Sequence, residues 1–290
     1  MNAKKIKTRI RRDWIDAFRT VIWYTYIERH FFNSKNYEIA KLIEPEVFGI
    51  DEEKDINNQI RWAKYKRGIH TPGQELINKA NGHVEGTANI INNVLWEAIR
   101  GRKSLKWFMS DGVNQLSWDV QRIIFKSVSG QNELISVLDI TKGLRRIERL
   151  ANLDALATLI IFFRIAVDQN QKEIALRIGR SIYRTLLVLC VFPPLANFSY
   201  GLAFLMYLYV FPLCQSEVRK FDSTDVDDFF DKFQKLNTIL LAAEDRDIID
   251  LKGKGISKKM YTNFLFDVLE GKRSLEVIRE FSPSFKKIIT

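Results

Sequence analysis

One segment near the middle of the chain restricts the fold more than any other feature. Residues 185–216 contain no Asp, Glu, Lys, Arg or His, and these 32 residues exceed the roughly 20 that a helix needs to cross a bilayer. Two adjacent prolines and the polar residues after them divide the segment into two shorter pieces, because proline does not continue a helix. We therefore predict two packed helices, the second of which, residues 201–211, is covered by neighbours on every face. Membrane insertion or interfacial association of the segment is the alternative.

Apolar residues elsewhere recur at spacings of three and four, which indicates amphipathic helices. The clearest examples lie in residues 14–27, 153–167, 174–186 and 258–269. No convincing series of alternating strands separated by turns is present. The sequence therefore predicts an all-α protein.

The composition is that of a globular protein with a basic charge balance. Hydrophobic residues make up 46% and charged residues 28%, which excludes disordered and fibrous classes. The formal net charge of +10 favours a polyanionic partner. Cys190 and Cys214 both lie in the uncharged segment, so neither a disulfide framework nor a thiolate metal site is expected. The basic N-terminus lacks the apolar region of a secretory signal, and we expect a cytoplasmic location.

Motifs that would indicate an enzyme are not found. The three histidines have no second ligand at metal-binding spacing, and no phosphate-binding loop, dinucleotide motif or nucleophile elbow occurs. Asp247, Asp250 and Lys252 resemble the acids and lysine of a metal-dependent nuclease only superficially, because no strands surround them. The aspartates of residues 222–231 fit the start of a helix better than a calcium loop. We predict no enzyme, no cofactor and no bound metal.

A short basic helix is predicted around Ile60, Trp62 and Tyr65. Four cations lie within seven residues with no acid between them: Arg61, Lys64, Lys66 and Arg67. On a helix, Trp62 and Tyr65 would share one face and anchor it, which leaves the cations mostly on the other. This arrangement is typical of a helix that faces phosphates, and the alternative is an ordinary solvated surface.

The stretch from Trp62 through Gly68 and Thr71-Pro72 to Leu76 resembles the end of the recognition helix in the phage-repressor (Cro and CI type) helix-turn-helix family. In this resemblance Gly68 ends one helix, Pro72 starts the next, and the aromatics form a small core with Leu76. Residues 38–40 are similar to the first helix of the motif, although Pro45 and an acidic stretch lengthen the connection. The resemblance extends over about residues 38–80.

The resemblance implies a set of residues that contact DNA. Side chains that would read base edges in the major groove are Asn58, Gln59, Arg61 and Lys64. Side chains that would bind phosphates are Lys66, Arg67 and Thr71. An N-terminal arm on the backbone or minor groove would contain Arg9, Arg11 and Arg12; a basic tail without a ligand is its alternative.

The sequence thus predicts a helix-turn-helix-like basic domain in residues 1–100, followed by a helical bundle with a very apolar central hairpin in residues 101–290. The predicted function is nucleic-acid binding, with duplex DNA as the partner, in a regulatory protein of bacterial or phage type. The bundle would serve as a homodimer interface or bind a protein partner. The alternative is a helical interaction protein or a membrane-associated protein that uses residues 185–216. Further cations at residues 142, 145, 146 and 149 would extend a positive surface if they shared one side.

Overall fold

The computed structural model describes residues 12–32, 34–49, 52–128, 130–214, 225–246, 249 and 258–272. Helices dominate these residues, as the sequence predicts, and the chain divides into two compact units, Met1–Asn92 and Asn93–Thr290. The boundary expected near Gly101 lies one short helix further along the chain. Each unit has its own buried core.

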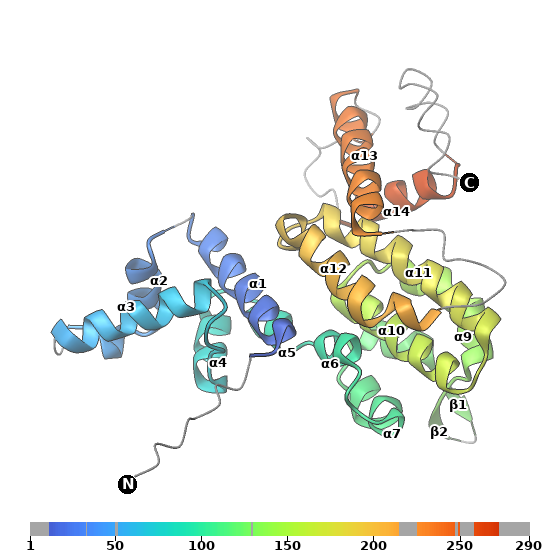
Figure 1. Cartoon of the computed structure of the whole chain (residues 1–290), viewed down its shortest axis with the longest axis horizontal. Helices are drawn as coiled ribbons and strands as arrows, with labels where there is room; N and C mark the ends of the chain where they lie inside the picture. Colours follow the sequence, from blue (N-terminus) through green and yellow to red (C-terminus); the bar gives the residue numbers. More distant parts are fainter. Residues whose placement is uncertain are drawn as a thin grey trace, which may run out of the picture. The chain divides into compact units, whose positions relative to one another are not determined.

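The first unit consists of short and medium helices, drawn in blue to blue-green in Figure 1. They are α1 (Trp14–His30), α2 (Asn36–Ile43), the 3-10 turn η1 (Pro45–Val47), α3 (Glu52–Lys66), α4 (Gln74–His83) and α5 (Thr87–Asn92). The helix α1 packs against both α3 and α5. It begins where the Asp13 carboxylate accepts a hydrogen bond from the Ile15 amide at 2.9 Å, which satisfies one of the free donors of the first turn.

The helix α3 begins earlier than predicted, and it ends where the sequence predicts. The acidic stretch expected before the helix forms its first turn, where carboxylates complement the helix dipole. At the other end, Gly68 has a φ of +64°, and its amide donates to the Tyr65 carbonyl at 2.9 Å. The Ile69 amide donates to the Lys64 carbonyl at 2.8 Å, which completes a Schellman C-cap. Pro72 precedes the Gly73 N-cap of α4, so the prediction that it lies in the first turn was wrong.

The second unit is a helical bundle with one small hairpin (Figure 1). Its first elements are α6 (Leu95–Arg100), α7 (Leu105–Trp107), the π-turn η2 (Phe108–Gly112), α8 (Trp118–Ile124), β1 (Phe125–Val128), β2 (Gln131–Leu134) and α9 (Val137–Glu148). They are followed by α10 (Leu153–Asp168), α11 (Lys172–Val191), η3 (Leu195–Phe198), α12 (Ser199–Tyr209), η4 (Phe211–Cys214), α13 (Val226–Asp245) and α14 (Lys258–Leu269).

The helix α10 lies at the centre of this bundle and packs against α11, α6 and α9. Most of its residues are buried, which fits its largely apolar composition. Two of its charged side chains form hydrogen bonds with other residues of the same unit. The Asp154 carboxylate accepts from the Asn93 amide group at 2.7 Å, and the Arg164 guanidinium donates to the carbonyls of Ala98 and Ile99 at 2.7 Å. Both contacts fix α10 to the segment that begins the unit.

The antiparallel pair β1 and β2 was not predicted. The register joins Phe125 to Leu134 and Val128 to Gln131, and Gly130 in the turn has a φ of +80°. Each strand has four residues, most of them exposed. Such short strands bury too few alternate side chains to give a recognisable period of two.

The uncharged segment contributes to two helices, but they differ in burial. Residues 185–191 of α11 are all buried, as expected for the first piece. The helix α12 leaves Tyr200, Phe204 and Leu208 about half exposed, so the prediction that neighbours cover its every face was wrong. Among the residues that the structure describes, one helical stretch, Leu195–Leu213, has the length and mean hydropathy to cross a membrane, and 44% of it is buried in the protein.

Candidate nucleic-acid interface

The C-terminal half of α3 is held in place by its two aromatic side chains. Trp62 is fully buried, and its ring stacks on Trp23 of α1 with centroids 5.9 Å apart. Tyr65 meets the same Trp23 ring edge-on at 6.0 Å, and burial raises the pKa of its hydroxyl above the usual value. Aromatic pairs of this kind add to the stabilisation from burial. The predicted anchoring role of both residues is therefore confirmed, and the opposite face of α3 is directed outward.

Arg61 does not face outward as a free cation. Its guanidinium donates to the Glu44 carboxylate at 2.6 Å, and the indole N–H of Trp62 donates to the same oxygen at 3.0 Å. The Glu44 side chain is only 7% exposed, whereas that of Arg61 is 37% exposed. A buried carboxylate needs a positive partner to offset its desolvation. The geometry therefore gives Arg61 a structural role in joining α3 to the end of α2.

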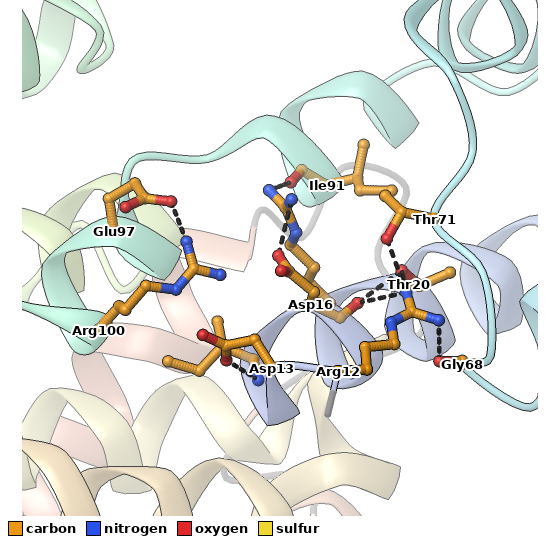
Figure 2. Close-up of polar contacts among 11 residues, drawn as sticks. Arg12, Asp13, Asp16, Thr20, Gly68, Thr71, Ile91, Glu97 and Arg100 are labelled. Carbon is orange, nitrogen blue, oxygen red and sulfur yellow. Dashed lines mark hydrogen bonds and ion pairs between the residues drawn. The ribbon is translucent and has the colours of Figure 1, made fainter. Parts of the chain in front are cut away.

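Arg12 and Thr71, both predicted to contact DNA, are in contact with each other. Figure 2 shows the Arg12 guanidinium between the start of α1 and the turn after α3. It donates to the Thr71 hydroxyl at 2.6 Å, to the Gly68 carbonyl, and to the Thr20 hydroxyl at 3.2 Å. These bonds fix the turn that follows α3, and they occupy donors that a phosphate would otherwise use. Arg9 and Arg11 lie outside the described residues.

Two more of the predicted residues have partners within the unit. The Lys66 ammonium forms an ion pair with Glu28 of α1 at 2.6 Å and lies 5.7 Å from the centre of the Tyr24 ring. The Asn58 amide group donates to the Val47 carbonyl at 3.1 Å, which ties α3 to η1. Lys66 is still exposed and could exchange its partner, because a surface ion pair contributes only about 0–1 kcal/mol. Asn58 is held more firmly by its backbone contact.

Three of the predicted residues stay available to a ligand: Gln59, Lys64 and Arg67. Gln59 and Lys64 make no side-chain hydrogen bond or ion pair with any residue that the structure describes. The side chain of Arg67, the residue after α3, donates only to the Ala63 carbonyl of this helix, at 3.2 Å, within the described part of the chain. Lys64 and Arg67 continue a line with Ile56 and Ile60 at helical spacing, and both isoleucines are exposed. We call these four residues the α3 stripe. It is apolar in its first half and basic in its second.

The charges around the α3 stripe favour its C-terminal end. Glu52, Glu53 and Asp55 occupy the first turn of α3, where they would repel phosphates. The described part of the first unit has eleven basic and eleven acidic side chains, so its overall field is nearly neutral. A polyanion would therefore respond to the local pair Lys64 and Arg67 rather than to the charge of the unit as a whole.

Other kinds of site have less support in the structure. Among the described residues, no three His, Cys, Asp or Glu side chains come together as potential metal ligands. Burial strongly raises the pKa of the Cys190 thiol, which keeps it in the unreactive protonated form. No protein-family model matches the chain, and neither a curated protein nor a solved structure matches it.

Proposed function

We propose that the protein binds nucleic acid, with duplex DNA as the expected partner, through the basic end of the α3 stripe. The observation that carries this proposal is that Lys64 and Arg67 have no acidic partner among the described residues. Lys64 lies in the last turn of the anchored helix α3, and Arg67 directly follows the end of this helix. Cations presented on a fixed element lose little additional freedom when they bind phosphates. The protein would act in the cytoplasm as a regulatory protein.

The arrangement supports a specific division of roles. Lys64 and Arg67 would contact the phosphate backbone, and the exposed amide of Gln59 would reach a base edge one turn earlier. The resemblance to the phage-repressor motif also implies that these three residues contact DNA, with the difference that Lys64 would there read a base edge. The acidic first turn of α3 makes the C-terminal half, rather than the N-terminus, the part that approaches the phosphates.

The test is binding of labelled random duplex DNA to the full chain, measured by fluorescence anisotropy at several salt concentrations between about 50 and 200 mM. In the variant with Lys64→Gln and Arg67→Gln, we expect weaker binding and a log–log salt dependence that is less steep by about 2, since each lost phosphate contact removes about 0.9. Glutamine keeps good helix propensity, so α3 should stay folded.

The matched control is Lys41→Gln with Lys54→Gln, which removes the same charge from exposed positions of the same unit. It should bind nearly as the wild type does. Arg61 is left unchanged because its loss would disturb Glu44 rather than report on DNA. The proposal fails if the wild type does not bind at the lower salt concentration, or if the control variant loses as much affinity as the α3 variant.

A second candidate function rests on the uncovered face of α12. Tyr200, Phe204 and Leu208 follow one another at spacings of four, are each about half exposed, and lie on a helix without a charged residue. An apolar face of this kind is a common feature of protein or membrane contacts. It favours the alternative of an interaction or membrane-associated protein, and it would also suit the proposed homodimer of the bundle.

One experiment distinguishes the two candidate functions. Replacing Phe204 with Lys adds a charge on the α12 face without touching α3. If the face binds lipid or a second copy, this variant should lose vesicle binding or dimerisation in sedimentation while retaining DNA binding. Unchanged sedimentation and the absence of vesicle binding by the wild type would remove the second candidate.

A further inference from the structure

The second unit contains a hollow that no sequence motif indicates. It has a volume of about 690 Å³ and is open to solvent. Its walls come from α8, from the last turn of α9 with the residues after it, and from the first turns of α14. The helix α14 lies more than a hundred residues after α8 and α9 in the chain, so only the fold brings its residues to this hollow.

The walls of the hollow are rich in cations. Arg122 comes from α8, Arg146 from α9, and Lys258 and Lys259 from the start of α14. All four are exposed, and none forms an ion pair with a carboxylate in the described part of the chain. Lys258 instead lies 5.4 Å from the centre of the Phe192 ring. We call these four residues the basic rim.

A fifth cation, Arg149, has a different position. Its guanidinium donates to the Asp267 carboxylate at 2.7 Å and to the Asn263 side-chain oxygen at 3.0 Å. It is therefore already paired, and these bonds hold α14 against the end of α9. Among the described residues that line the hollow, Asp119 is the single acid. The four cations of the basic rim therefore face one carboxylate. Like charges gathered around a concave surface concentrate the field inside it.

The remaining walls supply both apolar and hydrogen-bonding groups. Ile123 and Leu150 provide apolar surface, while Asn152 and Thr262 provide polar atoms. Sites for small molecules commonly have volumes of roughly 300–1,000 Å³ and combine an apolar lining with a few polar groups. Arginine and lysine together are suited to phosphate, the first through its planar donors and the second as a point charge.

We propose that this hollow binds a small ligand of nucleotide size that carries two or more phosphate groups. The basic rim contacts the phosphates from three helices, and the rest of the molecule lies against the apolar wall. The site is independent of the α3 stripe, since all of its residues belong to the second unit. A test of this site is therefore independent of a test of the proposed DNA binding.

The test is calorimetric titration of the full chain with inorganic pyrophosphate and with ATP. Wild type should bind ATP saturably, with pyrophosphate weaker because it lacks a part that reaches the apolar wall. The variant with Arg122→Glu and Arg146→Glu should lose at least about tenfold in affinity, because it replaces two charge-assisted contacts with repulsion. Both positions are exposed, and an unchanged circular dichroism spectrum checks that the fold is kept.

The matched control is Lys172→Glu with Arg177→Glu, which makes a similar charge change at exposed positions of α11 that do not line the hollow. It should bind ATP as the wild type does. Equal losses in both variants would overturn the proposal, as would the failure of pyrophosphate and ATP to bind the wild type. A further outcome would also overturn the proposal: the wild type binds duplex DNA but neither small anion, and the Arg122 and Arg146 variant loses this DNA binding. That result would assign the basic rim to nucleic acid.

Discussion

At the scale of single residues, Gly68 shows how one position fixes the end of α3. Its φ of +64° is unfavourable for other residues, and a Cβ at this position would lie 2.8 Å from the Ala17 carbonyl oxygen and 2.9 Å from a methyl group of Val21. Gly68→Ala should therefore lower the free energy of unfolding by more than the roughly 1–2 kcal/mol that the left-handed backbone alone costs. Urea denaturation followed by tryptophan fluorescence measures the loss.

The control for this prediction is Gly49→Ala in the same unit. Gly49 also has a positive φ, +79°, but a Cβ there would meet no atom within 4 Å. It should show the backbone cost without the steric one. If both variants lowered the free energy of unfolding by the same amount, the close approach between the turn after α3 and the helix α1 would add no steric cost.

The pair Arg61 and Glu44 gives a second prediction at this scale. Arg61→Met should destabilise the protein by about 1–3 kcal/mol, because the buried carboxylate keeps only the Trp62 donor. Adding Glu44→Gln to the same chain should recover much of that loss, since it removes the uncompensated charge. A double-mutant cycle in urea measures the coupling. Additive losses would show that the two side chains act independently.

At the scale of elements, α9, α11 and the end of α14 meet around Glu148. Its carboxylate is buried and lies 3.4 Å from the Arg184 guanidinium, which also contacts Glu270 at 3.2 Å. Burial raises the pKa of Glu148 above its usual 4.5 and outweighs the opposing charge of Arg184. The folded state therefore holds this proton more tightly than the unfolded state does.

The sign of the pH dependence follows from this shift. The contribution of Glu148 to stability is present at low pH and is lost as the pH rises through its raised pKa. Glu148→Gln imitates the protonated form, so its advantage in unfolding free energy over the wild type should grow between about pH 4 and pH 7. Urea titrations across this range measure the difference. A difference that stays constant across this range would contradict the prediction.

Long helices with clear apolar periodicity were predictable, as α10, α11 and α14 show. The start of α3 was not, because its first turn consists of acids, which suit a loop as well as the N-terminus of a helix. The open face of α12 was missed for another reason. Its sequence is apolar all round, and composition cannot tell which faces a neighbour covers.

At the scale of the whole molecule, the two units should unfold separately. Trp62 lies in the core of the first unit and Trp96 in that of the second, and both are fully buried. Trp62→Ala should cost about 3–5 kcal/mol and lower one calorimetric transition, while Trp96→Ala should lower the other. A single transition that moves as a whole in either variant would show that the chain unfolds as one cooperative body.

The candidate DNA site was predictable only in outline. The cluster of cations on α3 is visible in the sequence, and the anchoring by Trp62 follows from its spacing. Which cations remain available depends on acids that are distant in the chain, since Glu44 is 17 residues from Arg61 and Glu28 is 38 residues from Lys66. The basic rim requires still longer separations. Pairing between residues so far apart in the chain depends on the fold, so it could not be predicted from the sequence pattern alone.

The contact between Arg61 and Glu44 also limits how this protein can diverge over time. A neutral residue at position 61 leaves a buried charge, and a neutral residue at position 44 leaves a cation free beside the α3 stripe. In related chains the two positions should therefore change together. A lineage that lost the acid first would expose a third cation next to Lys64 and Arg67, and with it a stronger attraction for phosphates.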